Sequence, residues 1–104
     1  MTISTTSLTT SIGNAYVSAG NTAITFMSFC NYSSSTLFIN VWVVPAIDSA
    51  GTTNLLYSEL ELTANDTYQL YLGGEKLILS NGDKVQAQLT SGTGVTVVTS
   101  YTTI

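Results

Sequence analysis

The residues of this sequence that could do nucleophilic or acid–base chemistry are few. There is no histidine, so the usual general base is missing. Cys30 would need a base or a positive charge beside it to lower its pKa, and its neighbours Phe29 and Asn31 supply neither. We therefore interpret Cys30 as a small buried hydrophobic residue. A serine paired with Lys76 or Lys84 is an alternative that no motif supports.

Two carboxylates, Glu59 and Glu61, are spaced for the same face of a predicted strand. At the rise of a strand their side chains would lie about 6–7 Å apart, which could suit the carboxylate pair of a glycoside hydrolase. No aromatic platform for a sugar is evident beside them. We interpret them as a solvated face opposite Leu56, Leu60 and Leu62, and we expect no catalytic residue and no enzymatic activity.

The other acids predict no metal site. The His and Cys ligands that zinc favours are missing. Asp48, Asp66 and Asp83 fall in separate predicted loops without the spacing of an EF-hand, although a loose calcium site at a cluster of loops is an alternative. We expect no metal, no cofactor and no small-molecule ligand.

Two sequons, at residues 31–33 and 65–67, match the acceptor motif for N-glycosylation. Residues 1–6 lack the basic region and the apolar run of a signal peptide, so we expect none. We therefore interpret both sequons as chance matches in a chain rich in serine and threonine.

Composition points to one small domain with an uncharged surface. The chain has 104 residues, of which 44% are hydrophobic and only 8% charged, against about 25% in ordinary soluble domains. With two Lys plus Arg and a net charge of −4, it lacks the cations that nucleic acid or an anionic membrane requires. Few charges would have to be desolvated in a contact with other proteins or with copies of itself.

Hydrophobic residues alternate with period two and show no helical spacing, which predicts strands joined by short turns. The whole of residues 1–104 is expected to form a single antiparallel β-sandwich, jelly-roll or Ig-like, of about eight short strands. Residues 2–10 would be an extended N-terminal arm or an edge strand. The other predicted strands cover residues 15–19, 22–31, 36–44, 55–62, 67–72, 77–79, 84–90 and 95–101, and Gly73 and Gly74 would break the chain after the fifth of them.

Alternation also predicts which side chains share a face. In 22–31, Ile24 and Phe26 would face one way with Ser28 and Cys30, and Met27 and Phe29 the other way with Ala23 and Thr25. Residues 36–44 are apolar on both faces, so we expect a central strand that is covered on each side, with Trp42 in the core. Four tyrosines would sit at the boundary, with the ring buried and the hydroxyl in water: Tyr57, Tyr68, Tyr71 and Tyr101.

The only two cations, Lys76 and Lys84, flank an Asn81-Gly82 pair, the strongest short signal for a β-hairpin. We expect a hairpin between 77–79 and 84–90, with Glu75 and Asp83 beside the lysines. Such exposed charges keep the end of a hairpin solvated and carry no chemistry.

Several landmarks together resemble a known group of proteins. In order, they are Cys30-Asn31-Tyr32-Ser33, Val43-Val44-Pro45, Asn54-Leu55-Leu56-Tyr57, Asp66-Thr67-Tyr68 and Glu75-Lys76-Leu77-Ile78-Leu79-Ser80-Asn81-Gly82-Asp83-Lys84-Val85. Their order and spacing over residues 14–101 resemble small β-rich virion structural proteins of tailed bacteriophages, especially those of marine and cyanobacterial phages.

This resemblance implies a non-enzymatic accessory subunit, present in many copies, that decorates or stabilises a capsid. Its partners would be other virion proteins and copies of itself, and its location the virion, assembled in the host bacterial cytoplasm. A neck, tail or fibre-attachment protein is an alternative within the same class. A carbohydrate-binding module for host attachment is an alternative of another class, because six tyrosines and one tryptophan could supply stacking rings.

Overall fold

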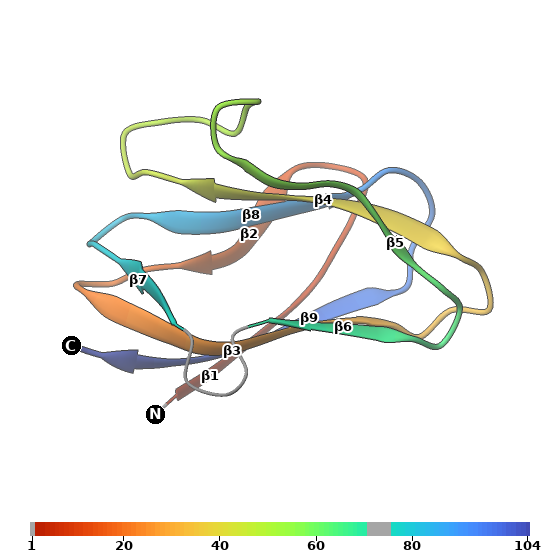
Figure 1. Cartoon of the computed structure of the whole chain (residues 1–104), viewed down its shortest axis with the longest axis horizontal. Helices are drawn as coiled ribbons and strands as arrows, with labels where there is room; N and C mark the ends of the chain where they lie inside the picture. Colours follow the sequence, from red (N-terminus) through yellow and green to blue (C-terminus); the bar gives the residue numbers. More distant parts are fainter. Residues whose placement is uncertain (1, 71–75) are drawn as a thin grey trace.

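Nine strands among the described residues form two antiparallel sheets that lie face to face (Figure 1). The computed structural model describes residues 2–70 and 76–104, and in these it contains no helix. The predicted all-β, antiparallel β-sandwich is therefore confirmed. Tyr71 and the predicted break at Gly73 and Gly74 lie outside the described residues, as does Glu75.

Each sheet has a simple strand order. Sheet A runs β1 (Thr2–Ser7), β9 (Val95–Thr103), β3 (Thr22–Asn31) and β6 (Thr67–Leu70), and β7 (Leu77–Leu79) also pairs with β3. Sheet B runs β2 (Gly13–Val17), β8 (Lys84–Leu89), β4 (Leu37–Val44) and β5 (Leu55–Leu62). Residues 2–7 are thus an edge strand paired with β9, and not an arm that extends from the domain.

The chain crosses between the sheets at most of its connections. Among the described strands, β4 and β5 are the one pair of sequence neighbours that also pair in a sheet. The other connections, apart from that between β6 and β7, lead from one sheet to the other. Most strand pairs therefore join segments that are far apart in the sequence.

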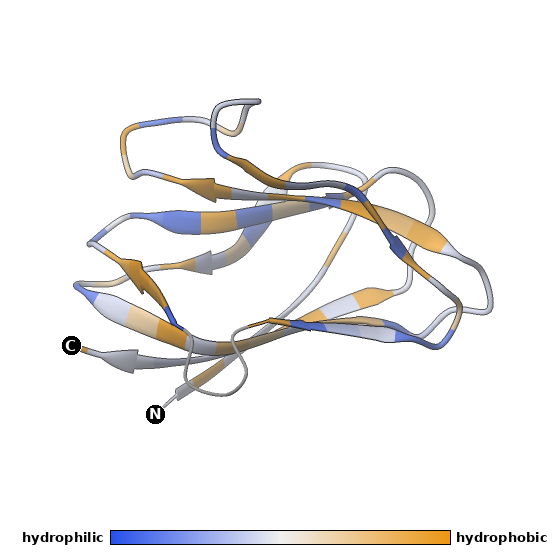
Figure 2. Ribbon diagram, in the orientation of Figure 1, coloured by the Kyte–Doolittle hydropathy of each residue, from blue (hydrophilic) through white to orange (hydrophobic). Residues whose placement is uncertain are grey.

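The core fills the space between the sheets. Apolar and paler segments alternate along strands of both sheets (Figure 2), as a sheet with one covered face requires. Phe29, Ile39, Leu89 and Val97 have no exposed surface, and burying each such side chain is worth about 1.5–3 kcal/mol. The remaining fully enclosed core residues include Ile24, Met27, Val41, Val85 and Val95.

Bulges shift the alternation that the sequence predicts. Within β3 the register with β9 jumps between Ile24 and Phe26, so Thr25 is an extra residue. Ile24 therefore joins Met27 and Phe29 in the core, whereas the sequence had placed it on the opposite face. The outer face of the strand holds Phe26, Ser28 and Cys30.

A second bulge corrects the predicted faces of β5. Glu59 has a φ of 51°, and its N–H donates to Oδ1 of Asn40 at 2.8 Å. The register with β4 shifts here, so Tyr57 packs against the core together with Leu60, while Leu56 is 42% exposed. A bulge inserts one residue and so reverses the faces on one side of it, which strict alternation does not anticipate.

Two pairs of tyrosines bridge the sheets. The rings of Tyr16 (β2) and Tyr101 (β9) lie 4.6 Å apart, and those of Tyr57 (β5) and Tyr68 (β6) meet edge to face at 5.5 Å. The Tyr68 hydroxyl donates to that of Tyr57 at 3.3 Å, so these side chains combine apolar packing with a polar end.

Candidate interaction surface

Cys30 lies on the outer face of sheet A and not in the core. Its backbone pairs with Thr67 of β6 and Thr96 of β9, and the side chain is half-buried among these neighbours. The prediction of a core position was wrong, because Met27 and Phe29 of the same strand face the core and alternation puts Cys30 on the opposite face. The surroundings of Cys30 are hydroxyl groups of threonine, which supply no base.

The carboxylates Glu59 and Glu61 are both exposed on β5, the edge strand of sheet B. Glu59 occupies the bulge, and Glu61 pairs with Phe38, which is 38% exposed. This arrangement agrees with a solvated position for both side chains.

The Asn81-Gly82 turn is present, but it does not form the predicted hairpin. β7 belongs to sheet A and β8 to sheet B, so the turn connects the two sheets. Only Gly82 of the pair has a positive φ, 87°, whereas a two-residue hairpin of the expected type needs positive φ at both positions. The turn was therefore predicted correctly. The prediction that the chain returns to the same sheet after it was wrong.

This turn holds two neighbouring connections in place. The Asp83 carboxylate accepts hydrogen bonds from the N–H groups of Ser80 and Ala46, both at 3.0 Å. Oδ1 of Asn81 accepts from Gly20 N–H at 2.8 Å, and the Gly82 N–H donates to the Ser18 carbonyl at 2.8 Å. Lys84, the cation at the start of β8, donates to the backbone carbonyl of Asp48 at 3.4 Å. The segment is therefore a structural junction.

No group of three or more His, Cys, Asp or Glu side chains within residues 2–70 and 76–104 could hold a metal ion. The Asp66 carboxylate instead accepts hydrogen bonds within its own turn. Thr63 Oγ1 donates to one carboxylate oxygen and Thr67 N–H to the other, both at 2.9 Å. The hydrogen bond from Thr63, followed by that from Thr67, lowers the pKa of Asp66 from its ordinary value of 3.8. The described part of the chain also includes no helix of the length and hydropathy that a membrane crossing requires.

Asn31, the acceptor asparagine of the first sequon, is fully buried at the end of β3. Its Nδ2 donates to the carbonyls of Ser35 and Leu62 at 2.8 and 2.9 Å, and its Oδ1 accepts from the Ser33 hydroxyl at 2.7 Å. A glycan attached to Nδ2 of Asn31 would break the hydrogen bonds that this nitrogen makes in the protein interior. The amide is thus a structural element of the connection between β3 and β4.

Trp42 is buried, but outside the core between the sheets. It is 8% exposed on the outer face of sheet B, next to Val44, which is fully buried. The prediction of a strand covered on both faces holds at this end of β4, while Phe38 at the other end is exposed. Trp42 therefore does not present its ring to solvent, as it would have to in order to stack on a sugar.

The most distinctive surface of the molecule is the outer face of sheet A. No strand of this sheet contains a charged residue. Paired residues of antiparallel strands point to the same side, so the register defines which side chains share this face. Its rows are Ser7–Thr96–Cys30–Thr67, Thr5–Val98–Ser28–Gln69, Ile3–Ser100–Phe26 and Thr102–Ala23–Ile78.

This face combines hydroxyl groups with a few exposed apolar side chains. Ile3 is 67% and Ile78 58% exposed, although both are large and hydrophobic. The described charged residues lie elsewhere, on β5, in the turns and loops, and at the start of β8. Depletion of charge is a property of the centres of protein–protein interfaces, because buried ions must lose their hydration.

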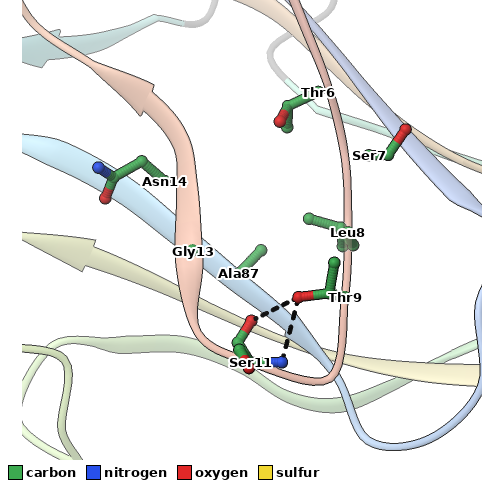
Figure 3. A pocket seen from close by; sticks show the side chains of 8 residues that line it. All are labelled: Thr6, Ser7, Leu8, Thr9, Ser11, Gly13, Asn14 and Ala87. Atoms are coloured by element: carbon green, nitrogen blue, oxygen red, sulfur yellow. Dashed lines mark hydrogen bonds between the residues drawn. The ribbon is translucent and has the colours of Figure 1, made fainter.

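A pocket of about 220 Å³ opens beside this face, between the edge strands β1 and β2 (Figure 3). Thr6 lines it from β1, Leu8 from just after β1, Gly13 and Asn14 from β2, and Ala87 from β8. In Figure 3 Thr6 and Ser7 point to opposite sides of β1. Its lining is uncharged, rich in hydroxyl groups and without an acid–base pair, so the pocket suits a neutral group.

Comparison with known proteins gives no match: no protein-family model fits the chain, and no curated protein or solved structure is significantly similar to it. The class of the molecule is thus given by its fold alone, an antiparallel β-sandwich.

Sequence reasoning recognised the low charge but not the surface that it creates. The signal was present, since none of the segments 2–7, 22–31, 67–70, 77–79 and 95–103 contains a charged residue. What the sequence could not supply was the strand order, which collects these five segments in one sheet.

Proposed function

We propose that this chain is a non-enzymatic structural subunit of a tailed-phage virion, which decorates or stabilises the capsid in many copies through protein–protein contacts. The observation that carries the proposal is the uncharged outer face of sheet A. An extended face of threonine, serine and exposed isoleucine side chains can be buried against another protein without the cost of desolvating ions.

The assignment to a virion rests on the ordered landmarks from Cys30 to Val85, which resemble those of small phage structural proteins. Other virion proteins would be its partners, and the virion, assembled in the host bacterial cytoplasm, its location. A position in the neck, the tail or a fibre attachment is the alternative within the same class. The number of copies per particle separates these positions.

Quantitative mass spectrometry of purified phage particles that carry this gene tests the proposal. A ratio to the major capsid protein near one, or near a simple fraction of one, is expected for decoration. A few dozen copies or fewer would place the chain in the neck, tail or fibre. Absence from washed particles, with the chain abundant in the infected cell, would overturn the structural role.

A further inference from the structure

On β1, one row of backbone groups has no partner strand among residues 2–70 and 76–104. Leu8 N–H donates to the Val95 carbonyl at 2.9 Å, which continues the β1–β9 ladder by one pair. Because hydrogen-bonded pairs alternate along antiparallel strands, the N–H and C=O groups of Ile3, Thr5 and Ser7 point away from β9. They form an accessible edge on which another strand can pair.

The other edges of the two sheets carry features that discourage such pairing. β2 is bulged between Asn14 and Tyr16, and β5 has a bulge and two glutamates. In the part of the chain that the structure describes, β6 and β7 have four and three residues. β1 has six residues in unbroken register with β9 and contains no charge, proline or bulge. Proteins usually protect exposed edges with one of these devices, so an unprotected edge marks a place for a partner strand.

We infer that β1 pairs with β1 of a second copy of this chain, antiparallel, across a two-fold axis at Thr5. This register places Ile3 opposite Ser7 of the second copy, so the outward-pointing residues meet in three hydrogen-bonded pairs. Each such pair exchanges two backbone hydrogen bonds. The two A sheets then form one continuous sheet, and the exposed Ile3 side chain gains cover from the neighbouring strand.

Charge favours a second copy at this edge. The net charge of the chain is −4, so two copies repel each other wherever their acids approach. β1 carries no charged residue and pairs with β9, which carries none either, whereas the opposite edge of sheet B brings Glu59 and Glu61 together. Self-pairing through β1 therefore brings no charged strand residues close to one another.

The pocket next to β1 receives the inward side chains of the added strand. In this register Ser4 of the second copy lies opposite Thr6, and Thr2 of the second copy lies opposite Leu8. Thr6 and Leu8 both line the pocket. Small hydroxyl side chains match a neutral, hydroxyl-lined space, and pockets for alternate side chains are how strand addition gains specificity.

Sedimentation of the purified chain from about 1 µM to about 1 mM measures the pairing, since contacts of this limited size are weak. We expect a monomer–dimer equilibrium. Thr5→Pro removes one outward N–H donor from each copy without removing a bond within the chain, and should weaken the dimer about tenfold to a hundredfold. The matched variant Thr5→Val keeps this N–H and should dimerise like the wild type. A strictly monomeric chain, or a Thr5→Pro dimer of unchanged affinity, would overturn the inference.

Disulfide trapping tests the register without relying on proline. In a Cys30→Ser background, Thr5→Cys places two thiols opposite each other, where hydrogen-bonded Cα atoms lie about 5.5 Å apart and a disulfide can form. Ser7→Cys is the control, because two Ser7 positions would be offset by four residues, about 13 Å. Mild oxidation should give a covalent dimer only with Thr5→Cys. Equal trapping of both variants, or of neither, contradicts pairing at Thr5.

Self-pairing through the β1 edge would join copies of the chain, while the outer face of sheet A meets another virion protein, and the pairing rests on the proposed structural role for its biological meaning. The two remain separable by experiment. A chain that is monomeric in solution yet abundant in particles refutes the pairing alone, and a chain that dimerises yet is absent from particles refutes the structural role alone.

Discussion

At the scale of single residues, one side chain is in a place that its chemistry does not favour. Thr99 lies on the inner side of β9 with no exposed surface, and its hydroxyl has no hydrogen-bond partner among the described residues. A buried hydroxyl without a partner loses its bonds to water and gains none in return.

We predict that Thr99→Val raises the free energy of unfolding by about 1 kcal/mol, because valine has the same shape and no group to desolvate. Urea unfolding measures the change. Thr102→Val on the outer face of the same strand is the control and should stay within about 0.5 kcal/mol of the wild type. A loss of stability in Thr99→Val would show that its hydroxyl does have a partner.

The positions of some individual side chains were predicted correctly from the sequence, and those of others were not. The packing of Tyr57, Tyr68 and Tyr101 against the core was predicted correctly, since an amphipathic ring at the boundary suits either sheet. Cys30 was misplaced, because both faces of β3 carry apolar residues and packing decides which one is covered, and Ile24 was misplaced, because its face depends on a single extra residue at Thr25. Nothing in the residue types around Thr25 announces a bulge.

At the scale of elements, the Ser80–Lys84 connection does more than reverse the chain. Asp83 bonds the N–H of Ser80 within the turn and that of Ala46 in the loop after β4. A methyl group on Gly82 would come within 2.9 Å of the Ala46 side chain, so these two connections are packed as closely as they are bonded.

We predict that Asp83→Ala lowers the free energy of unfolding by about 1–3 kcal/mol, because it removes both charge-assisted hydrogen bonds. Thermal and urea unfolding measure the loss. Asp48→Ala is the matched control, since the contact of Asp48 in this region uses its backbone carbonyl, and it should be nearly neutral. Equal stability of the two variants would show that the Asp83 carboxylate does not hold the two connections together.

Strand positions were readable from the sequence, whereas strand partners were not. Alternation located the segments that became β3, β4, β5 and β9 to within a few residues. The Asn81-Gly82 pair led to the wrong prediction of a hairpin. Such a pair predicts that the chain turns, but it does not predict which sheet the chain enters next. Partner choice depends on contacts between distant segments, such as those of β1 with β9.

At the scale of the whole molecule, the strand order sorts the charges. The chain crosses repeatedly between the sheets. As a result, sheet A contains every described strand without a charged residue except β2 and β4. Among the described residues one large face is therefore uncharged, while the acids lie on β5 and in the connections. Low overall charge was visible in the sequence, but a surface suited to contact appears only after folding.

We propose that this outer face of sheet A docks against another virion protein. The most direct test of this docking is the occupancy of Thr96→Lys on purified particles, relative to the major capsid protein, with Thr90→Lys as the control outside this face. We predict that Thr96→Lys lowers occupancy about tenfold or more, because an unpaired charge would be buried, and that Thr90→Lys does not. Wild-type occupancy of a folded Thr96→Lys chain would show that this face does not dock.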